Sequence, residues 1–237
     1  MKYSLSDFDD KLLNGFVFCE MVYSLWEEIR QSPDGIERIR LRKSQLEKKL
    51  VEELTPISRF IQAYYNQGRQ LKVKWKNGSQ PNDLEVFSSG WLVEQGYCPA
   101  NHYVEVTTAV HKNDHILRQL LHENGGGFTV KGIRRDSKTK KYLSEPYGYV
   151  NDEHVIDLAN QIIERIDAKN QKSYPDNTIL VIQCFTDTLI FENEWEEAIR
   201  MVKNKKIKCR FKEVFVFESN HRFASTLFYF QENNTPD

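Results

Sequence analysis

The length, composition and charge of the chain indicate a soluble globular protein and exclude several other classes. Its 237 residues are 40% hydrophobic and 28% charged, enough for one large domain, or a domain with an appendage, to build a core. The formal net charge of −1 gives no overall attraction to nucleic acid, so any basic surface has to be local. No apolar run reaches the roughly 18–20 residues of a membrane span. The N-terminus lacks a charged-then-apolar signal pattern, so we expect a cytoplasmic protein with no membrane partner.

The first part of the chain predicts two long helices. The first runs from about Asp7 to Gln31, where the turn residues Ser32-Pro33-Asp34-Gly35 end it. The second runs from about Ile36 to Tyr65, and Pro56 is expected to kink or split it because proline has no N–H to donate.

The middle of the chain predicts three consecutive strands. Leu71–Trp75 and Pro81–Phe87 alternate between apolar and polar residues, and Asn77-Gly78 between them is the favoured two-residue hairpin turn. The third strand, His102–Val110, is rich in β-branched residues and places Glu105 in its centre. An ionised carboxylate in a central strand needs a cation, hydrogen-bond donors or a raised pKa, whereas an edge strand could leave it in water.

The rest of the chain continues as alternating helices and strands. A helix begins at Asn113 or Asp114 and ends at the glycines 125–127, which lack the lysine of a nucleotide-binding loop. The further expected elements are a strand at Phe128–Ile133, a helix from Asp152 to about Lys169, a buried strand at Thr178–Phe185, a helix at Glu194–Lys203, and strands at Glu213–Phe217 and Ser225–Phe230. The four cysteines lie far apart without a C-x-x-C pair, so we expect reduced thiols, with Cys184 in the core.

Three acids fall on successive elements that could aim them at one point. Glu53 lies within the apolar stripe of the second helix, Asp83 on the return strand of the hairpin, and Glu105 on the next strand. Hard carboxylate oxygens at one point suit Mg²⁺, which activates water and offsets negative charge during phosphodiester hydrolysis.

This arrangement resembles the PD-(D/E)XK nuclease superfamily. The matching stretches are Gln80-Pro81-Asn82-Asp83 and Tyr103-Val104-Glu105-Val106-Thr107, with Glu53 as the helix acid that some members add. The resemblance covers about residues 43 to 135, or as far as Phe185. It implies an α/β (α+β) restriction-endonuclease-like core, in which helices flank a central mixed β-sheet and the elements follow as helix, three strands, helix, strand. The nuclease domain would span residues 43–237, with residues 1–42 as an N-terminal helical extension.

The sequence departs from the motif at two positions. Asn82 separates Pro81 from Asp83, which is harmless because the proline takes no part in the chemistry. Thr107 stands where the family has a lysine that positions water and stabilises the phosphorane. The very-short-patch mismatch endonucleases are similar in using a threonine near the metal. We therefore expect Thr107 to support the water or the metal, or Lys112 at the start of the next helix to substitute for the lysine in space.

Local basic segments are the candidate contacts to nucleic acid. The turn after Ile133 is either a solvated turn or a phosphate-backbone contact made by Arg134, Arg135, Lys138, Lys140 and Lys141. His111 and His115 have helical i, i+4 spacing but no third ligand nearby, so His111 is a candidate phosphate contact instead of a metal ligand. A second basic run, residues 203–210, is interpreted as a helix end that complements the helix dipole.

These features together predict a hydrolase that cuts nucleic acid, with DNA as the expected substrate and Mg²⁺ or Mn²⁺ as the cofactor. Asp83 and Glu105 would be metal ligands, and Glu53 an outer ligand or water positioner. The resemblance also allows a homodimer. The alternative is a catalytically inactive module of the same fold that binds nucleic acid or a protein partner, and a different fold also stays open.

Overall fold

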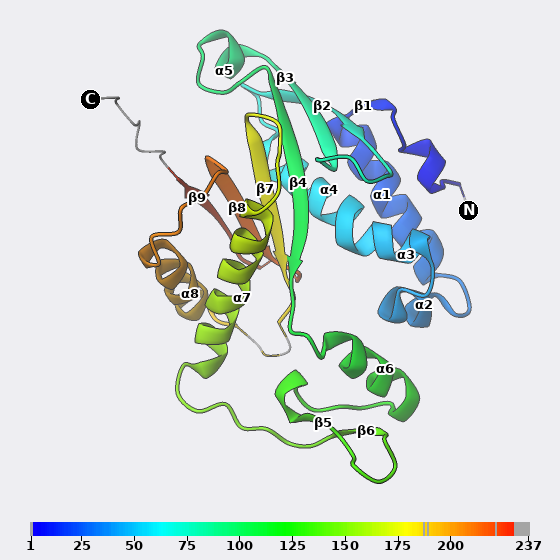
Figure 1. The fold of residues 1–237 in the computed structure, drawn as a ribbon. Helices are drawn as coiled ribbons and strands as arrows, with labels where there is room; N and C mark the ends of the chain where they lie inside the picture. The colour runs from blue at the N-terminus through cyan, green and yellow to red at the C-terminus, as the bar shows by residue number, and fades with distance from the viewer. Residues whose placement is uncertain (1, 187, 189, 221, 230–237) are drawn as a thin grey trace.

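A seven-stranded mixed β-sheet with helices on both faces forms the centre of the computed structural model, which describes residues 2–186, 188, 190–220 and 222–229 (Figure 1). The strands lie in the order β1 (Leu12–Asn14), β2 (Gln70–Trp75), β3 (Leu84–Ser89), β4 (Asn101–Ala109), β7 (Thr178–Cys184), β8 (Glu213–Glu218) and β9 (Ala224–Phe228). Strands β1 to β4 are antiparallel, β4, β7 and β8 are parallel, and β9 is antiparallel to β8. The expected α/β class with a mixed central sheet flanked by helices is confirmed.

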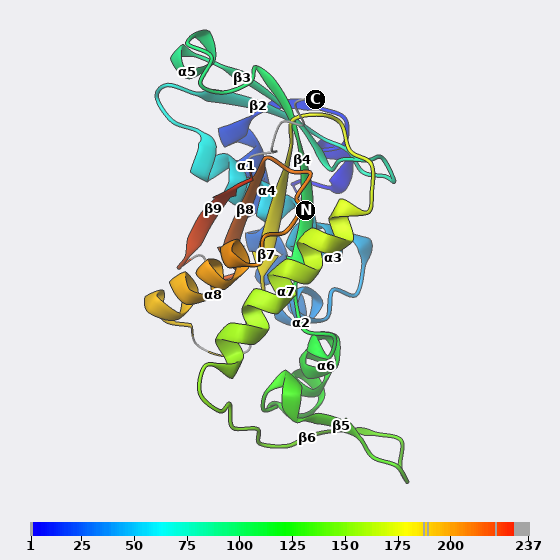
Figure 2. The ribbon, with the colours of Figure 1, turned by 60° about the vertical axis from the view of Figure 1, so that its left-hand side comes forward.

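The two faces of the sheet have separate cores. Helices α1 (Gly15–Arg30) and α4 (Thr55–Tyr64) pack on one face, and α7 (Glu153–Asn170) and α8 (Glu192–Asn204) on the other. Every residue of β7 is buried, because a parallel strand covered on both faces reads as a continuous apolar run. In β4, Val104 and Val106 belong to the core of α1 and α4, so the alternating residues Glu105 and Thr107 face α7, which crosses the sheet in Figure 2.

The N-terminal helices differ from the expectation. The chain first forms a 3₁₀ turn, η1 (Leu5–Asp7), and strand β1, and α1 begins only where the Asn14 side chain accepts the N–H of Phe16 at 2.9 Å. Strand β1 pairs with β2, and α1 packs within the same core as α4. The expected domain boundary at residue 42 stays a prediction.

The helix expected over residues 36–65 changes at Leu54, where Pro56 was expected to kink or split it, but it is also interrupted near Arg42, which was not expected. It is divided into α2 (Gly35–Leu41), α3 (Gln45–Lys49), the π-helical turn η2 (Leu50–Leu54) and α4. Arg42 ends α2 in a left-handed conformation, and Ser44 caps α3. Because Pro56 has no N–H, the helix changes its hydrogen bonding just before it, and the Thr55 N–H reaches back to the carbonyl of Leu50.

The connection between β2 and β3 also differs from the predicted tight turn. Strand β2 ends at Trp75 and β3 begins at Leu84, so residues 76–83 form a longer loop and Asp83 lies just before its strand. There the Asp83 N–H donates to the Val104 carbonyl at 3.0 Å, and its carboxylate accepts the Val106 N–H at 2.8 Å. The side chain thus replaces a backbone acceptor beside β4 at the point just before β3 begins.

A long excursion separates β4 from α7. It contains α6 (Asp114–Asn124), the 3₁₀ turn η3 (Val130–Gly132) and a separate two-stranded sheet of β5 (Ile133–Arg135) and β6 (Tyr142–Ser144). Another short helix, α5 (Trp91–Glu94), lies between β3 and β4. The strand expected at Phe128–Ile133 is therefore wrong, because most of it is irregular or 3₁₀ and β5 does not join the central sheet. The helix expected from Asp152 to Lys169 is confirmed as α7. The last expected strand is confirmed as β9, although Phe230 lies outside the described residues.

Candidate active site

Asp83 and Glu105 come close together between the start of β3 and the middle of β4. Only 7% of Glu105 is exposed to solvent. Burial, followed by repulsion from the charge of Glu105, raises the pKa of Asp83 from 3.8 to about 6. Asp83 at the start of β3 and Glu105 on β4 therefore lie close enough for the charge of Glu105 to act on Asp83.

A lysine and a tyrosine from beyond the third strand complete the surroundings of Glu105. Lys169, in the last turn of α7, forms an ion pair with Oε1 of Glu105 and is itself only 16% exposed. The Tyr174 hydroxyl donates to the same oxygen at 3.3 Å, and burial together with the charge of Glu105 raises the pKa of Tyr174. Sequence reasoning missed both residues, because only the packing of α7 on the sheet brings them to β4.

Glu53 lies at the edge of this cluster. It sits on the π-helical turn η2, half-buried, and Lys49 one helical turn earlier contacts its Oε1 at 2.6 Å. Burial raises the pKa of Glu53, Lys49 opposes that shift, and the charge of Asp83 adds to it. The second oxygen, Oε2, is buried without a hydrogen bond of standard geometry in the described structure, and an interaction with the Trp75 side chain lowers the pKa of Glu53. Glu53 is therefore a core-facing carboxylate beside Asp83.

The two candidates for the missing lysine have different positions. Thr107 lies on β4 two residues beyond Glu105, on the same face and half-buried. Lys112 is exposed in the turn between β4 and α6. The ammonium group that contacts Glu105 is that of Lys169, so the structure does not support the substitution expected from Lys112.

The expected nucleic-acid contacts lie apart from the acids. The five basic residues all lie on the β5–β6 hairpin, which extends away from the central sheet, and all five are exposed: Arg134, Arg135, Lys138, Lys140 and Lys141. Arg134 is paired with Glu145. His111 lies just after β4, half-buried, with its Nδ1 accepting the N–H of Asn113 at 3.1 Å.

The acids suit a hard divalent cation with few protein ligands. Among the described residues, no group of three or more His, Cys, Asp or Glu side chains is arranged to hold a metal ion. Mg²⁺ is commonly held by one or two carboxylates and several waters, so Asp83 and Glu105 fit it without a third protein ligand.

In the described part of the chain, no helix has the length and apolar composition needed to cross a bilayer. No family model, curated protein or solved structure matches the chain.

Proposed function

We propose that the chain is a metal-dependent nuclease of the PD-(D/E)XK type, which hydrolyses phosphodiester bonds of nucleic acid, with DNA as the expected substrate. The observation that carries the proposal is the meeting of Asp83, Glu105 and Lys169 between two adjacent strands and a helix. Two acids and a lysine at one point provide ligands for a metal and a positive charge for the phosphate.

The order of elements supports the same assignment. A helix, η2 with α4, precedes the antiparallel strands β2, β3 and β4, and α7 then leads into β7 parallel to β4. This is the order of helix, three strands, helix and strand that the resemblance implies. Residues 110–152 would be an insertion between the third strand and the following helix.

Each residue of the cluster has a chemical role in this proposal. Asp83 and Glu105 would hold Mg²⁺ or Mn²⁺, with Glu53 as an outer ligand. A bound metal supplies an activated water and offsets charge on the phosphate. Lys169 takes the place of the lysine missing at Thr107, because its ammonium group stabilises negative charge beside Glu105. The Thr107 hydroxyl orients water from the same face of β4.

The second candidate is an inactive module of the same fold. The Lys169 ion pair favours it, because this ammonium group already neutralises the carboxylate that a metal would use. The two candidates differ in metal binding: a nuclease must bind a divalent cation at Glu105, whereas an inactive module need not.

Cleavage assays on the purified chain test the proposal. Single- and double-stranded DNA and RNA are incubated with Mg²⁺ or Mn²⁺, and products are resolved on denaturing gels. We expect metal-dependent cleavage that Glu105→Gln abolishes. Glu85→Gln is the matched control, because Glu85 is a half-buried carboxylate on the neighbouring strand β3 that pairs with Lys74 and Lys76 instead. Cleavage that survives Glu105→Gln would refute the nuclease, and absence of cleavage on every substrate would leave the inactive module.

A further inference from the structure

A second candidate site lies at the carboxyl ends of β4 and β7. A cavity of about 540 Å³ is bordered there by the ends of these strands, by α2, by α6 and by the amino-terminal half of α7. None of the three acids Glu53, Asp83 and Glu105 lines it. Its volume is typical of small-molecule sites, and the carboxyl end of parallel strands is where α/β sheets bind ligands.

Arg42 is the most unusual residue in the cavity wall. Its side chain is only 9% exposed, its Nη1 donates to Glu52 at 2.7 Å, and its guanidinium lies 4.9 Å from the ring centre of Phe185. Its Nε is nonetheless buried without a hydrogen-bond partner in the described structure. The residue also has a φ of 51°, a conformation that costs energy for a non-glycine residue. Burial, reinforced by the charge of Arg118, lowers the pKa of Arg42, and Glu52 and Asp114 oppose that shift.

Other polar groups of the wall are also unsatisfied. The hydroxyl of Thr186 and the amide oxygen of Gln161 are buried, and no hydrogen bond reaches either one within the described residues. Arg40 is exposed at the rim of the cavity, donates to the Leu121 carbonyl at 3.5 Å, and has no carboxylate partner among the described residues. An unsatisfied buried polar group is costly, so the three in this wall, on Arg42, Thr186 and Gln161, indicate a ligand.

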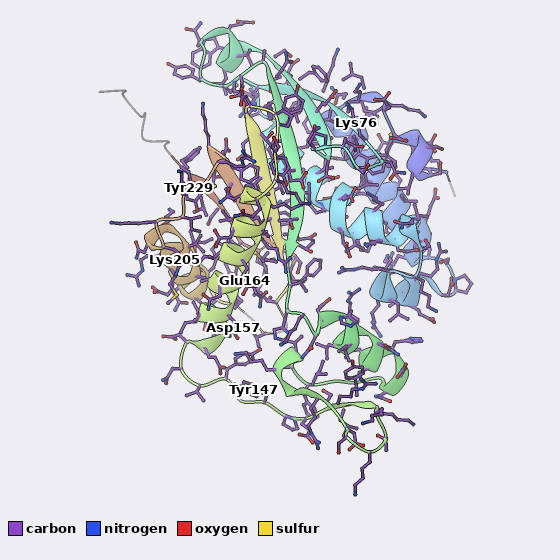
Figure 3. All side chains as sticks on the ribbon, viewed as in Figure 1. Lys76, Tyr147, Asp157, Glu164, Lys205 and Tyr229 are labelled. Carbon is purple, nitrogen blue, oxygen red and sulfur yellow. The ribbon has the colours of Figure 1, made fainter. Side chains whose placement is uncertain are left out.

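The two carboxylates in the wall, Asp114 and Asp157, each have a cationic partner, and Lys131 is shared between Asp157 and Glu153. Asp114 pairs with Arg118 at 2.8 Å. Asp157, labelled on α7 in Figure 3, pairs with Lys131 at 2.5 Å. The groups left to bind a ligand are therefore mainly donors, namely the Arg42 Nε–H, the Thr186 hydroxyl and the Arg40 guanidinium. An oxyanion is the ligand that accepts from such a set.

We propose that this cavity binds a nucleoside monophosphate group. The phosphate would accept from Arg42, Thr186 and Arg40, since guanidinium and hydroxyl donors match its oxygens. A bare phosphate would leave most of the cavity empty, and the apolar side chains of Leu117 and Val130 offer a surface to the sugar and base. The group is either a free mononucleotide or the terminal nucleotide of a strand. This binding is separate from the proposed cleavage, because it uses none of the acids.

Calorimetric titration of the full chain, with metal chelated by EDTA, tests the site. The probes are the four nucleoside 5′-monophosphates, inorganic phosphate, adenosine, and a short oligonucleotide with and without a 5′-phosphate. Thr186→Val removes a hydroxyl without a partner and should leave the fold intact, while Arg42→Gln and Arg40→Gln remove charge. Lys48→Gln is the matched control, because Lys48 is exposed on α3, outside the cavity.

We expect one monophosphate group bound per chain, with affinity reduced about tenfold or more by Thr186→Val and by Arg42→Gln, and unchanged by Lys48→Gln. If the mononucleotide binds more tightly than the 5′-phosphorylated oligonucleotide, the ligand is a free nucleotide. If the oligonucleotide binds more tightly, the ligand is the end of a strand. The site is refuted if adenosine binds as well as its monophosphate, if Thr186→Val has no effect, or if no phosphate probe binds at about 10 mM. Because no metal is present, loss of cleavage does not affect the result.

Discussion

At the scale of single residues, the ionisation of the acids is central. Asp83 and Glu105 carry like charges in a buried place, and among the described residues Lys169 forms an ion pair with Glu105 and no cation does so with Asp83. Such a pair is unfavourable without a further cation, and this cost is what a metal site exploits. Substitutions of Asp83 and Lys169 therefore test the proposed metal binding and the stability of the fold separately.

Asp83→Asn should stabilise the metal-free chain at neutral pH but not in acid. The pKa of Asp83 is raised from 3.8 to about 6 in the folded state, so stability is lost as the pH rises through about 4 to 6. The amide cannot ionise and still accepts the Val106 N–H, so the variant should gain on the order of 2–3 kcal/mol at pH 7.5 and little at pH 4. Urea unfolding in EDTA at both pH values measures this, with Glu85→Gln as the control. An equal effect at both pH values would contradict a raised pKa for Asp83 in the folded chain.

Lys169→Met should lower the rate of cleavage without abolishing metal binding. A charged group at the reacting phosphate contributes about 10²–10³-fold to the rate, so kcat should fall by this factor while Lys169→Arg retains part of the activity. Lys172→Met removes a neighbouring exposed charge and is the control. Lys112→Met tests the alternative directly: a large loss there, with Lys169→Met unaffected, would restore Lys112 to the role.

At the scale of elements, the inserted segment is the least expected part of the fold. The small β5–β6 sheet has no ladder to the central sheet and carries five exposed basic residues. If the proposed nuclease function holds, a phosphate-backbone contact made by these residues would lie apart from the acids. The π-helical turn η2 has a different importance, since it presents Glu53 to Asp83.

Neutralising the hairpin should weaken nucleic-acid binding without changing the fold. The variant changes Arg135, Lys138, Lys140 and Lys141 to Gln, and the slope of log K against log salt should become shallower by about 0.9 for each of these side chains that binds a phosphate. Fluorescence anisotropy with labelled duplex DNA at several salt concentrations measures this slope. The control changes four exposed residues at and after the end of α8: Lys203, Lys205, Lys206 and Lys208. Equal slopes in the two variants would argue against the hairpin as a specific binding surface.

At the scale of the whole molecule, a buried polar group makes the fold sensitive to acid. His102 on β4 is 1% exposed and lies against Arg69, whose Nη2 is 3.4 Å from its Nε2. Burial, followed by the charge of Arg69, lowers the pKa of His102 to about 3. The histidine is therefore neutral in the folded chain, and protonation favours the unfolded state.

The contribution of His102 to stability should be complete above about pH 6.5 and should decrease as the pH falls toward 3. The pH dependence of stability that His102 causes is opposite in sign to the one that Asp83 causes over the same range, so the two must be measured separately. In the Asp83→Asn background, replacing His102 by Gln should flatten the loss of stability between pH 6.5 and 4. Thermal unfolding followed by circular dichroism measures the slope. An unchanged slope would show that His102 does not control acid unfolding.

The sequence by itself determined the features that depend on local pattern. The alternation of β4, with Glu105 in its centre, the buried run of β7 and the extent of α7 all follow from the period of apolar residues. These patterns also placed Cys184 in the core, where it is fully buried with a free thiol.

Only the tertiary structure decided which side chains meet. Lys169 is 64 residues from Glu105 in the chain, and no periodicity relates the end of a helix to the middle of a strand. The sequence predicted the change at Pro56, but the break between α2 and α3 depends on the left-handed conformation of Arg42, which no local pattern indicates. The cavity at the ends of β4 and β7 has the same origin, because its walls come from segments far apart in sequence. Local pattern fixes the direction of a side chain on its own element, whereas the distance between elements is set by how their faces pack.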